Sequence, residues 1–376
     1  MSITHLRVFV AKSEIHLPTW CDHITGARHI TRMRTAHPAP FPDFFRRSDA
    51  ILEKIGLPRT EVSDLTAFGT GPFGDILVKN ESDRLGLGAF KAIGGFYAVA
   101  RLLADRRTGT TPVESLRLVT ASAGNHGLSV AAGARFYGLD CRIHLPRTTP
   151  DHFIDRIRAL GAGVDDTSPT YELAVARAKA DGQVPGSLYL SDTADTVTEV
   201  GPRYVMEGYT RIADELKAAF ETDGGWPNHV YLHAGVGGLA AAMAWSIRHT
   251  WRVQPHIVIV EADRAPCLAE SARLGRAVTV AGAESVMHRL DCKTPSAIAL
   301  HLLSRLDVSY VQISDDEAIH AAHTLEEMGY TTTPSGAAGY GGYLKARPEP
   351  HGRNRALTLV TELAQTNSIA SERVRL

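Results

Sequence analysis

Cysteine and long apolar runs are both scarce in this sequence, and each scarcity excludes a class of protein. The chain of 376 residues has only four cysteines, which form no CxxC pair: Cys21, Cys141, Cys267 and Cys292. We therefore expect neither a disulfide framework nor a cysteine zinc site, and we interpret the cysteines as reduced thiols of a cytoplasmic protein. No run reaches the ~18 apolar residues of a membrane span, and the first residues lack the pattern of a secretory signal. We expect neither membrane insertion nor secretion.

An excess of charge of one sign is also lacking. Lysine and arginine together number 40, against 41 aspartates and glutamates. No overall field therefore attracts nucleic acid or an anionic membrane, and we expect a small polar ligand instead. The 17 histidines include no HExxH motif, and His23, His29 and His37 have no regular ligand spacing. We predict no metal site.

The order of apolar segments is typical of an α/β protein. From about residue 116, runs rich in β-branched residues alternate with segments of helical periodicity, as in βαβ units with a mostly parallel sheet. The predicted strands are residues 116–121, 141–146, 187–192, 229–235, 255–262, 309–314 and 356–362. The predicted helices are residues 128–139, 151–161, 171–182, 205–220 and 314–329. Ser314 and Glu317 form a capping-box pattern, and the turn-rich segment 221–228 predicts a boundary between units.

A glycine loop follows an apolar strand in HVYLHAGVGGLAAAMAW. Gly235, Gly237 and Gly238 lead directly into a helix, where backbone N–H groups and the positive end of the helix dipole suit a phosphate. Two other interpretations stay open at this point. Either the turn only allows close helix packing, or Gly235, Gly237 and Ala240 form a dinucleotide fingerprint with Glu261 as the ribose-binding acid.

A second loop, VTASAGNHGLSV, also joins a strand to a helix. Its small residues Ser122, Gly124 and Gly127 let the backbone approach a ligand, so that N–H groups receive a carboxylate while the amide of Asn125 reaches a ring oxygen. His126 lies in the turn, where a histidine is more often a local hydrogen-bonding residue than a catalytic one.

The third feature is Lys91 in the segment GAFKAIGGFYAVARLL. Ile93, Phe96, Ala100 and Leu103 follow helical spacing, so the lysine lies near a helix start, where a cation opposes the dipole. We expect a lysine in this position to lose its proton readily, as a Schiff-base amine requires. The alternative is an ordinary lysine whose stem packs on its neighbours and whose charged head reaches solvent.

In this order along the chain, the lysine segment, the asparagine loop and the glycine loop together resemble the tryptophan-synthase β-subunit superfamily of pyridoxal-phosphate enzymes, known as fold type II. The resemblance extends over residues 84–366 and decides against a dinucleotide. Within the superfamily, the chain is most similar to the diaminopropionate ammonia-lyases. The similar segments include RLGLGAFKAIGG, SAGNHG, SDTADTVTEVGPRYVMEGYTRIADE, HAGVGGLAAA, IVEADRAPCL, TPSGAAG and LVTE.

This resemblance implies an α/β fold with two open, twisted, mostly parallel sheets flanked by helices. Residues 1–115 plus 218–376 would form a large domain that binds pyridoxal 5'-phosphate. Residues 116–217 would form a small mobile domain that carries the asparagine loop. The resemblance also implies a homodimer.

The roles of individual residues follow from the same resemblance. Lys91 would form a Schiff base with pyridoxal 5'-phosphate, and Asn125 would bind the 3-oxygen of the cofactor. The backbone N–H groups that bind the phosphate would be those of Gly235, Val236, Gly237, Gly238 and Leu239. Thr361 would supply the hydroxyl near the pyridine nitrogen, with Ser335 as the lesser candidate. The loop that receives the substrate carboxylate would consist of Ser122, Ala123, Gly124, Asn125 and His126.

The implied activity is β-elimination from a small L-amino acid such as 2,3-diaminopropionate, which yields a 2-oxo acid and ammonia. Lys91 would remove the Cα proton, and Asp192 or the Lys91 ammonium would protonate the leaving group. The sequence departs from the family at Ala123, where the family has an aspartate implicated as a base toward D-substrates, so we predict turnover of L-substrates and not of D-substrates. The ending LVTELAQTN also departs, because it lacks the family's glycine and aspartate.

Three alternative functions stay open. A β-replacement synthase would add a nucleophile to the same intermediate, and a serine/threonine dehydratase would differ only in the leaving group. A protein that binds the cofactor without catalysis is the third, and the retained Lys91 argues against it.

Overall fold

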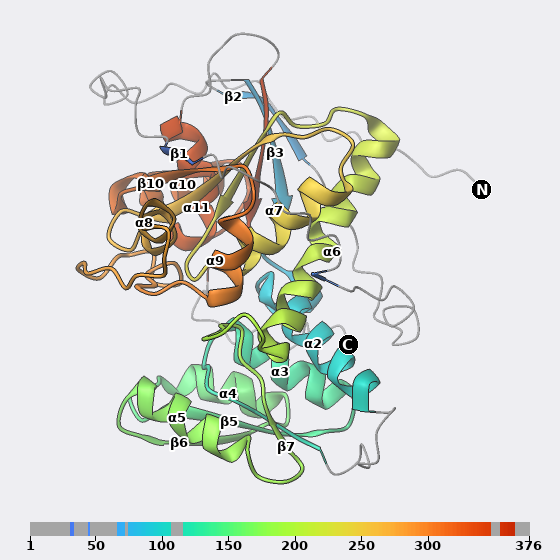
Figure 1. Cartoon of the computed structure of the whole chain (residues 1–376), viewed down its shortest axis with the longest axis vertical. Helices are drawn as coiled ribbons and strands as arrows, with labels where there is room; N and C mark the ends of the chain where they lie inside the picture. Colours follow the sequence, from blue (N-terminus) through green and yellow to red (C-terminus); the bar gives the residue numbers. More distant parts are fainter. Residues whose placement is uncertain are drawn as a thin grey trace.

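The helices and strands of the chain form two α/β units, one below the other in the view of Figure 1. The computed structural model describes residues 31–33, 44–45, 66–71, 74–106, 116–346 and 354–364. The lower unit in the figure contains a four-stranded sheet, and the upper unit contains a seven-stranded sheet. The predicted fold class, with two mostly parallel sheets flanked by helices, is confirmed.

The larger sheet is parallel in its interior and antiparallel at its two edges. Its strands in spatial order are β1 (Thr31–Met33), β10 (Val308–Ile313), β9 (His256–Ala262), β8 (His229–His233), β11 (Arg355–Val360), β3 (Gly74–Asn80) and β2 (Thr66–Gly71). The pairs β1–β10 and β2–β3 are antiparallel, and the pairs between them are parallel. Because parallel strands end at the same edge of a sheet, the loops after β8 and β11 lie side by side.

The smaller sheet is entirely parallel. Its strands in spatial order are β6 (Gly163–Ser168), β5 (Asp140–Pro146), β4 (Arg117–Thr120) and β7 (Ser187–Tyr189). Its helices are α3 (Asn125–Phe136), α4 (Asp151–Ala159) and α5 (Tyr171–Asp181). The sequence does not predict β6, because GVDDTS is polar. This strand lies at the edge of the sheet, where pairing with β5 fixes it without an apolar pattern.

Helices cover both faces of the larger sheet. Val230 and Leu232 of β8 belong to an apolar core shared with α6 (Val200–Asp223), α7 (Gly238–Thr250) and α9 (Ala297–Leu303). Tyr231, between them in sequence, packs on the opposite face with α10 (Asp315–Glu327) and α11 (Pro334–Ala346). The alternation of side chains along a strand thus divides the interior into two layers.

Helix α2 (Lys91–Arg106) joins the two units, because it packs against α6 on one side and α3 on the other. A Cβ on Gly94 would lie 2.2 Å from Cε1 of Tyr209 in α6, and a Cβ on Gly95 would lie 2.3 Å from Oγ of Ser129 in α3. That Oγ also donates to the carbonyl of Ala92, at 2.7 Å. The glycine pair therefore allows close helix packing at the end of α2 that carries Lys91.

Most predicted elements are confirmed. All seven predicted strands are present, and the capping box is formed, with the Ser314 hydroxyl accepting from the Glu317 N–H at 3.2 Å. Helix α6 ends inside the predicted boundary segment 221–228. It also crosses the predicted domain limit at residue 217, so the domain division stays a prediction. Cys21, His23, His29 and His37, for which predictions were made, lie outside the described residues.

Three expected absences concern the described part of the chain. Cys141, Cys267 and Cys292 are free thiols there. None of the described helices combines the length and the apolar character needed to cross a membrane. Within the same residues, no group of three or more potential ligands could hold a metal ion.

Candidate active site

Lys91 forms an ion pair with Asp192 at the junction of the two units. The lysine is the first residue of α2, and the aspartate lies between β7 and α6. Nζ of Lys91 donates to Oδ2 of Asp192 at 2.6 Å. The two side chains are 34% and 21% exposed, so a small molecule can reach them.

This pair changes the proton affinity of both groups. Burial alone would lower the pKa of Lys91, but the Asp192 carboxylate outweighs it, and the pKa is raised. Burial would likewise raise the pKa of Asp192, but the charge and the hydrogen bond of Lys91 hold that pKa well below its usual range. The expectation that Lys91 loses its proton readily is therefore wrong for the protein alone. Local sequence shows the helix end and apolar neighbours, but not an aspartate 101 residues away.

The glycine loop lies beside this pair. Gly237 precedes α7 with a φ of 97°, which favours glycine, and its carbonyl accepts the helical hydrogen bond from the Ala241 N–H at 2.9 Å. The N–H groups before Ala241 have no carbonyl one turn earlier within the helix, so they can receive an anion. A Cβ on Gly238 would lie 4.0 Å from the carbonyl oxygen of Asp192. The predicted phosphate loop and the Lys91–Asp192 pair thus line one region.

Asn125 also reaches this region. It is the first residue of α3, and its Nδ2 donates to Oε2 of Glu362 at 3.1 Å. Glu362 forms a β-bridge with Ala89, two residues before Lys91. The amide predicted to bind a ring oxygen and the predicted Schiff-base lysine are therefore neighbours, although they come from different units.

Thr361 forms a neutral polar pair with His233. Its Oγ1 lies 2.8 Å from Nε2 of the histidine, and both residues are buried. Its carbonyl accepts from the Phe90 N–H at 2.9 Å, which holds the end of β11 against the residue before Lys91. Burial lowers the pKa of His233 to about 4, so the imidazole is uncharged at neutral pH. The sequence predicted the hydroxyl but not its histidine partner.

The predicted carboxylate loop runs from Ser122 into the first turn of α3, with Gly124 as the N-terminal cap residue. N–H groups in the first turn of this helix are suited to an anion. Nε2 of His126 contacts the Leu190 carbonyl at 3.1 Å, so this ring nitrogen is already engaged. Burial lowers the pKa of His126, so the ring is neutral, and its buried Nδ1 has no partner among the described residues. Ala123 packs against the apolar core.

Two charged residues at this site were not predicted. Nε of Arg289 pairs with Oε2 of Glu362 at 2.5 Å, and Oε1 of the same carboxylate accepts from the Thr333 hydroxyl at 2.5 Å. The backbone N–H of Arg289 donates to Oγ of Ser335 at 3.3 Å. Glu362 was visible in the LVTE segment, but no sequence pattern distinguished Arg289, which lies between α8 (Cys267–Leu274) and α9.

Glu261, which the dinucleotide interpretation assigned to a ribose, instead binds the backbone at the start of helix α8. Its carboxylate accepts from the backbone N–H groups of Leu268 and Ala269, both at 2.8 Å. It thereby caps α8 inside the protein, where burial raises its pKa to about 8. This carboxylate is buried and is engaged by the helix, so it is not offered to a ribose.

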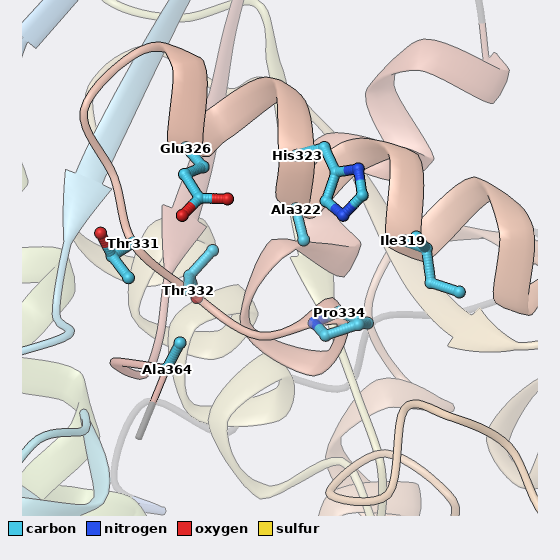
Figure 2. A pocket seen from close by; sticks show the side chains of 8 residues that line it. All are labelled: Ile319, Ala322, His323, Glu326, Thr331, Thr332, Pro334 and Ala364. Carbon is cyan, nitrogen blue, oxygen red and sulfur yellow. The ribbon is translucent and has the colours of Figure 1, made fainter. Parts of the chain in front are cut away.

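A separate cavity of about 200 Å³ lies between α10 and the start of α11, and none of the predicted site residues lines it (Figure 2). The lining residues are Ile319, Ala322, His323, Glu326, Thr331, Thr332, Pro334 and Ala364. The hydroxyl of Thr332 donates to the backbone carbonyl of Glu362 at 2.6 Å, so this cavity adjoins the end of β11 from the other side.

The arrangement fits a phosphate-bearing aldehyde. An amine (Lys91), a helix N-terminus with a left-handed glycine (Gly237), an amide (Asn125) and a neutral hydroxyl (Thr361) meet at the ends of the parallel strands. The unpartnered Nδ1 of His126 is a further buried acceptor beside the ion pair. These are the groups that a lysine-bound cofactor of this kind requires.

Comparison with known proteins agrees with this chemistry. A model of the family "Pyridoxal-phosphate dependent enzyme" matches residues 55–362. The chain belongs to this family of enzymes, and its cofactor is pyridoxal 5'-phosphate.

Two proteins and one crystal structure illustrate what the chain is similar to within this family. The diaminopropionate ammonia-lyase of Escherichia coli (strain K12) is 32% identical over 286 residues, which are 71% of either chain. The L-serine dehydratase/L-threonine deaminase of Mus musculus is 32% identical over 205 residues, 54% of this chain and 59% of that protein. A crystal structure of the Escherichia coli diaminopropionate ammonia-lyase in complex with D-serine superposes with a TM-score of 0.75 and 27% identity, covering 89% of this chain and 93% of the other. The expected fold type II architecture is confirmed.

Proposed function

We propose that the protein is an ammonia-lyase that eliminates the β-substituent of a small L-amino acid such as 2,3-diaminopropionate, yielding a 2-oxo acid and ammonia. The observation that carries this proposal is the 2.6 Å contact between Lys91 and Asp192, next to the glycine loop. Similarity to the diaminopropionate ammonia-lyases over 71% of the chain supports it.

Pyridoxal 5'-phosphate, when bound, supplies an electron sink that makes the Cα proton of an amino acid acidic. Lys91 is the residue that we propose for its covalent attachment, and Asn125 for its 3-oxygen. The proposed phosphate contacts are the N–H groups of Gly235, Val236, Gly237, Gly238 and Leu239. Thr361, held by the neutral His233, presents a hydroxyl without a charge at the pyridine nitrogen.

Lys91 carries out both proton transfers in this proposal. As a free amine it takes the Cα proton, and Asp192 stabilises the ammonium that forms, because the carboxylate raises the pKa of the lysine. The ammonium then donates its proton to the leaving group. Asp192 itself is a poor proton donor, since its pKa is held well below the usual range. We therefore propose Asp192 as the residue that sets the basicity of Lys91.

The loop from Ser122 to His126 is the proposed site of the substrate carboxylate. Backbone N–H groups in the first turn of α3 suit this anion. Ala123 supports turnover of L-substrates only, since a methyl group cannot take a proton from the opposite face of Cα. Oxo-acid formation should be measured from each enantiomer of 2,3-diaminopropionate and of serine. We expect product from the L-enantiomers alone, and efficient turnover of either D-enantiomer would contradict the role given to Ala123.

A serine/threonine dehydratase is the second candidate, and the 32% identity to the Mus musculus enzyme favours it over the remaining alternatives. The dehydratase reaction has the same steps as the ammonia-lyase reaction and differs only in the group that leaves Cβ. The ratio of kcat/KM for L-2,3-diaminopropionate and L-serine separates the two: a preference for serine supports the dehydratase. Suppression of oxo-acid release by an added thiol or amine, with a new amino acid formed, would instead indicate β-replacement.

Three further features belong to the same proposal. We propose that residues 116–217 form a small domain that moves against residues 1–115 plus 218–376, because the smaller sheet is separate from the larger one. We also propose a homodimer located in the cytoplasm. The free thiols of the described residues support the reducing compartment. Light scattering on the holoenzyme tests the dimer, and a monomeric mass would contradict it.

A further inference from the structure

Arg289 is fixed at the candidate active site with part of its guanidinium unused. Its Nε is paired with Glu362 at 2.5 Å, and its backbone N–H donates to Ser335. The Glu362 carboxylate is shared with the amide of Asn125 and the hydroxyl of Thr333. Neither Nη atom of Arg289 has an acceptor among the described residues. One edge of the guanidinium therefore holds the arginine in place, and the other edge remains available.

The available edge faces the proposed carboxylate loop. Nη1 of Arg289 would lie 3.3 Å from a Cβ placed on Gly124, the residue that precedes α3. The side chain of Arg289 is 34% exposed, as is that of Lys91. The guanidinium is also close enough to Lys91 for its charge to act on the lysine pKa in the lowering direction. Arg289 thus lines the space between the proton-transfer group and the loop.

A second arginine approaches the same place from the smaller unit. Arg156 of α4 is half-buried, and its Nη2 lies 3.4 Å from the Leu87 carbonyl. It has no carboxylate partner among the described residues. A Cβ placed on Gly88 would lie 3.8 Å from that Nη2. The carbonyl of Gly88 accepts a hydrogen bond from the N–H of Leu363, which follows Glu362 directly in the chain. Burial and the charge of Arg289 lower the pKa of Arg156, so the two cations repel each other.

The charges of the site leave a positive excess. Asp192 is committed to Lys91, and Glu362 is committed to Arg289. Arg156 has no such partner, and His126 is neutral. Arg289 lies beside the loop, and Arg156 lies near enough to Arg289 for the two charges to interact. A planar guanidinium binds a carboxylate through two parallel hydrogen bonds, which a lysine cannot form.

We propose that the physiological substrate is an L-amino acid with a second carboxylate, at Cβ or on a short chain beyond it, and that Arg289 and Arg156 bind this group. The inference rests on the proposed function, since it names the substrate class of the same elimination. Arg289 is then a specificity-determining residue that contacts the substrate, while Lys91 still transfers the protons. The second carboxylate relieves the repulsion between the two arginines, which adds to its selectivity.

The binding experiment uses L-aspartate and L-alanine with the holoenzyme, because neither ligand carries a β-substituent that can be eliminated. Dissociation constants are measured by calorimetry. We expect L-aspartate to bind at least tenfold more tightly, equivalent to about 1.4 kcal/mol. Arg289→Gln should abolish this preference, Arg289→Lys should restore part of it, and Arg156→Gln should reduce it. Arg276→Gln, which removes an exposed arginine after α8, is the matched control and should leave the preference unchanged.

Equal affinities for the two ligands in the unmodified protein would overturn the inference. Equal weakening of both ligands by Arg289→Gln would also overturn it, because the arginine would then serve the α-carboxylate or the fold. If Arg289→Gln does not fold, the affinity ratio of the unmodified protein and the Arg156→Gln variant still decide the question.

The turnover experiment compares L-threo-3-hydroxyaspartate with L-serine, which share a hydroxyl leaving group. The hydroxyl leaves as water with the Cα proton, and water returns as the imine hydrolyses, so the net products are oxaloacetate and ammonium from the first and pyruvate and ammonium from the second. We expect at least a tenfold higher kcat/KM for the dicarboxylate. Turnover of serine or diaminopropionate without this preference contradicts the inference and leaves the proposed function intact. A preference for L-aspartate in binding with no turnover of any substrate supports the assignment of Arg289 and Arg156 to the second carboxylate and contradicts the proposed function.

Discussion

Two groups of opposite charges lie at the two ends of the segment from Lys79 to Lys91, and they differ in exposure. In the first, Nζ of Lys79 and Nη2 of Arg84 contact the same Glu215 oxygen at 2.9 and 2.8 Å, and Glu81 binds the arginine as well. All four of these side chains are at most 3% exposed. The pKa of Arg84 is raised and that of Glu215 is lowered, because the carboxylates and cations outweigh the effect of burial.

The second group is the Lys91–Asp192 pair, which is open to small molecules. It contains one cation and one anion, and the lysine is 34% exposed where Lys79 is fully buried. The comparison shows that a close ion pair alone does not indicate a reactive site. The buried cluster ties β3 to α6 and fixes the start of the segment. The Lys91–Asp192 pair, in contrast, can exchange a proton with a bound molecule.

The largest expected effect is the loss of activity when Lys91 of the Lys91–Asp192 pair is replaced. Lys91→Ala should lower kcat/KM by about 10⁴-fold or more, since general acid–base catalysis alone supplies up to about that factor. The change should lower the melting temperature of the protein without cofactor only slightly, because the ion pair that it removes is partly exposed. The visible absorption of covalently bound cofactor should disappear, and an unchanged absorption spectrum in the variant would contradict the assignment of Lys91.

A change in the buried charge cluster should lower the free energy of unfolding. Glu215→Ala leaves Lys79 and Arg84 buried with only Glu81 between them, and removal of one partner from a buried ion pair costs about 3–5 kcal/mol. Denaturant unfolding of the holoenzyme measures this loss. The exposed pair of Lys179 and Asp195, at 2.6 Å, provides the matched control.

For Lys179→Ala we expect a loss of at most about 1 kcal/mol, because exposed ion pairs contribute little. Similar losses in the Glu215 and Lys179 variants would remove the distinction between buried and exposed pairs. The Glu215 contribution should also depend on pH. Its pKa is lowered in the folded protein, so this stability is present above the usual pKa of a glutamate and is lost as the pH falls through the folded value.

The smallest expected change is a shift in the pH profile. Asp192→Asn removes the charge that raises the pKa of Lys91, so the acid limb of kcat, where the lysine must lose its proton, should move to lower pH. At the optimum we expect a decrease of about 10²-fold, at the low end of the range for a group that tunes acid–base catalysis. An acid limb at the original pH would show that Asp192 does not set the basicity of Lys91.

The Lys91–Asp192 pair also stabilises the folded protein only within a defined pH range. The raised pKa of Lys91 means that its contribution is complete below the usual lysine pKa and is lost as the pH rises through the folded value. The lowered pKa of Asp192 means that its contribution is present above the usual aspartate pKa and is lost in stronger acid. Both contributions are therefore present across the neutral range, where the enzyme would be assayed.

Much of the fold could be predicted because its signals are local. Apolar runs marked all seven predicted strands, and the Ser314–Glu317 pattern marked the start of α10. The edge strand β6 was missed because its sequence is polar and its pairing with β5 is what defines it. The start of α3 was placed three residues late, since the loop residues from Asn125 to Gly127 already belong to the helix.

The sequence by itself determined the cofactor chemistry of this protein. An amine, an amide, a hydroxyl and a glycine turn are properties of short segments, and backbone N–H groups at a helix start need no distant partner. Tertiary structure decided the protonation of Lys91, the pairing of Thr361 with His233, and the convergence of Arg289 on Glu362. These depend on charges and hydroxyls more than 70 residues apart in the chain, which only the folded structure brings together. Electrostatic interactions act through space, so their sign at an atom is fixed only by folding.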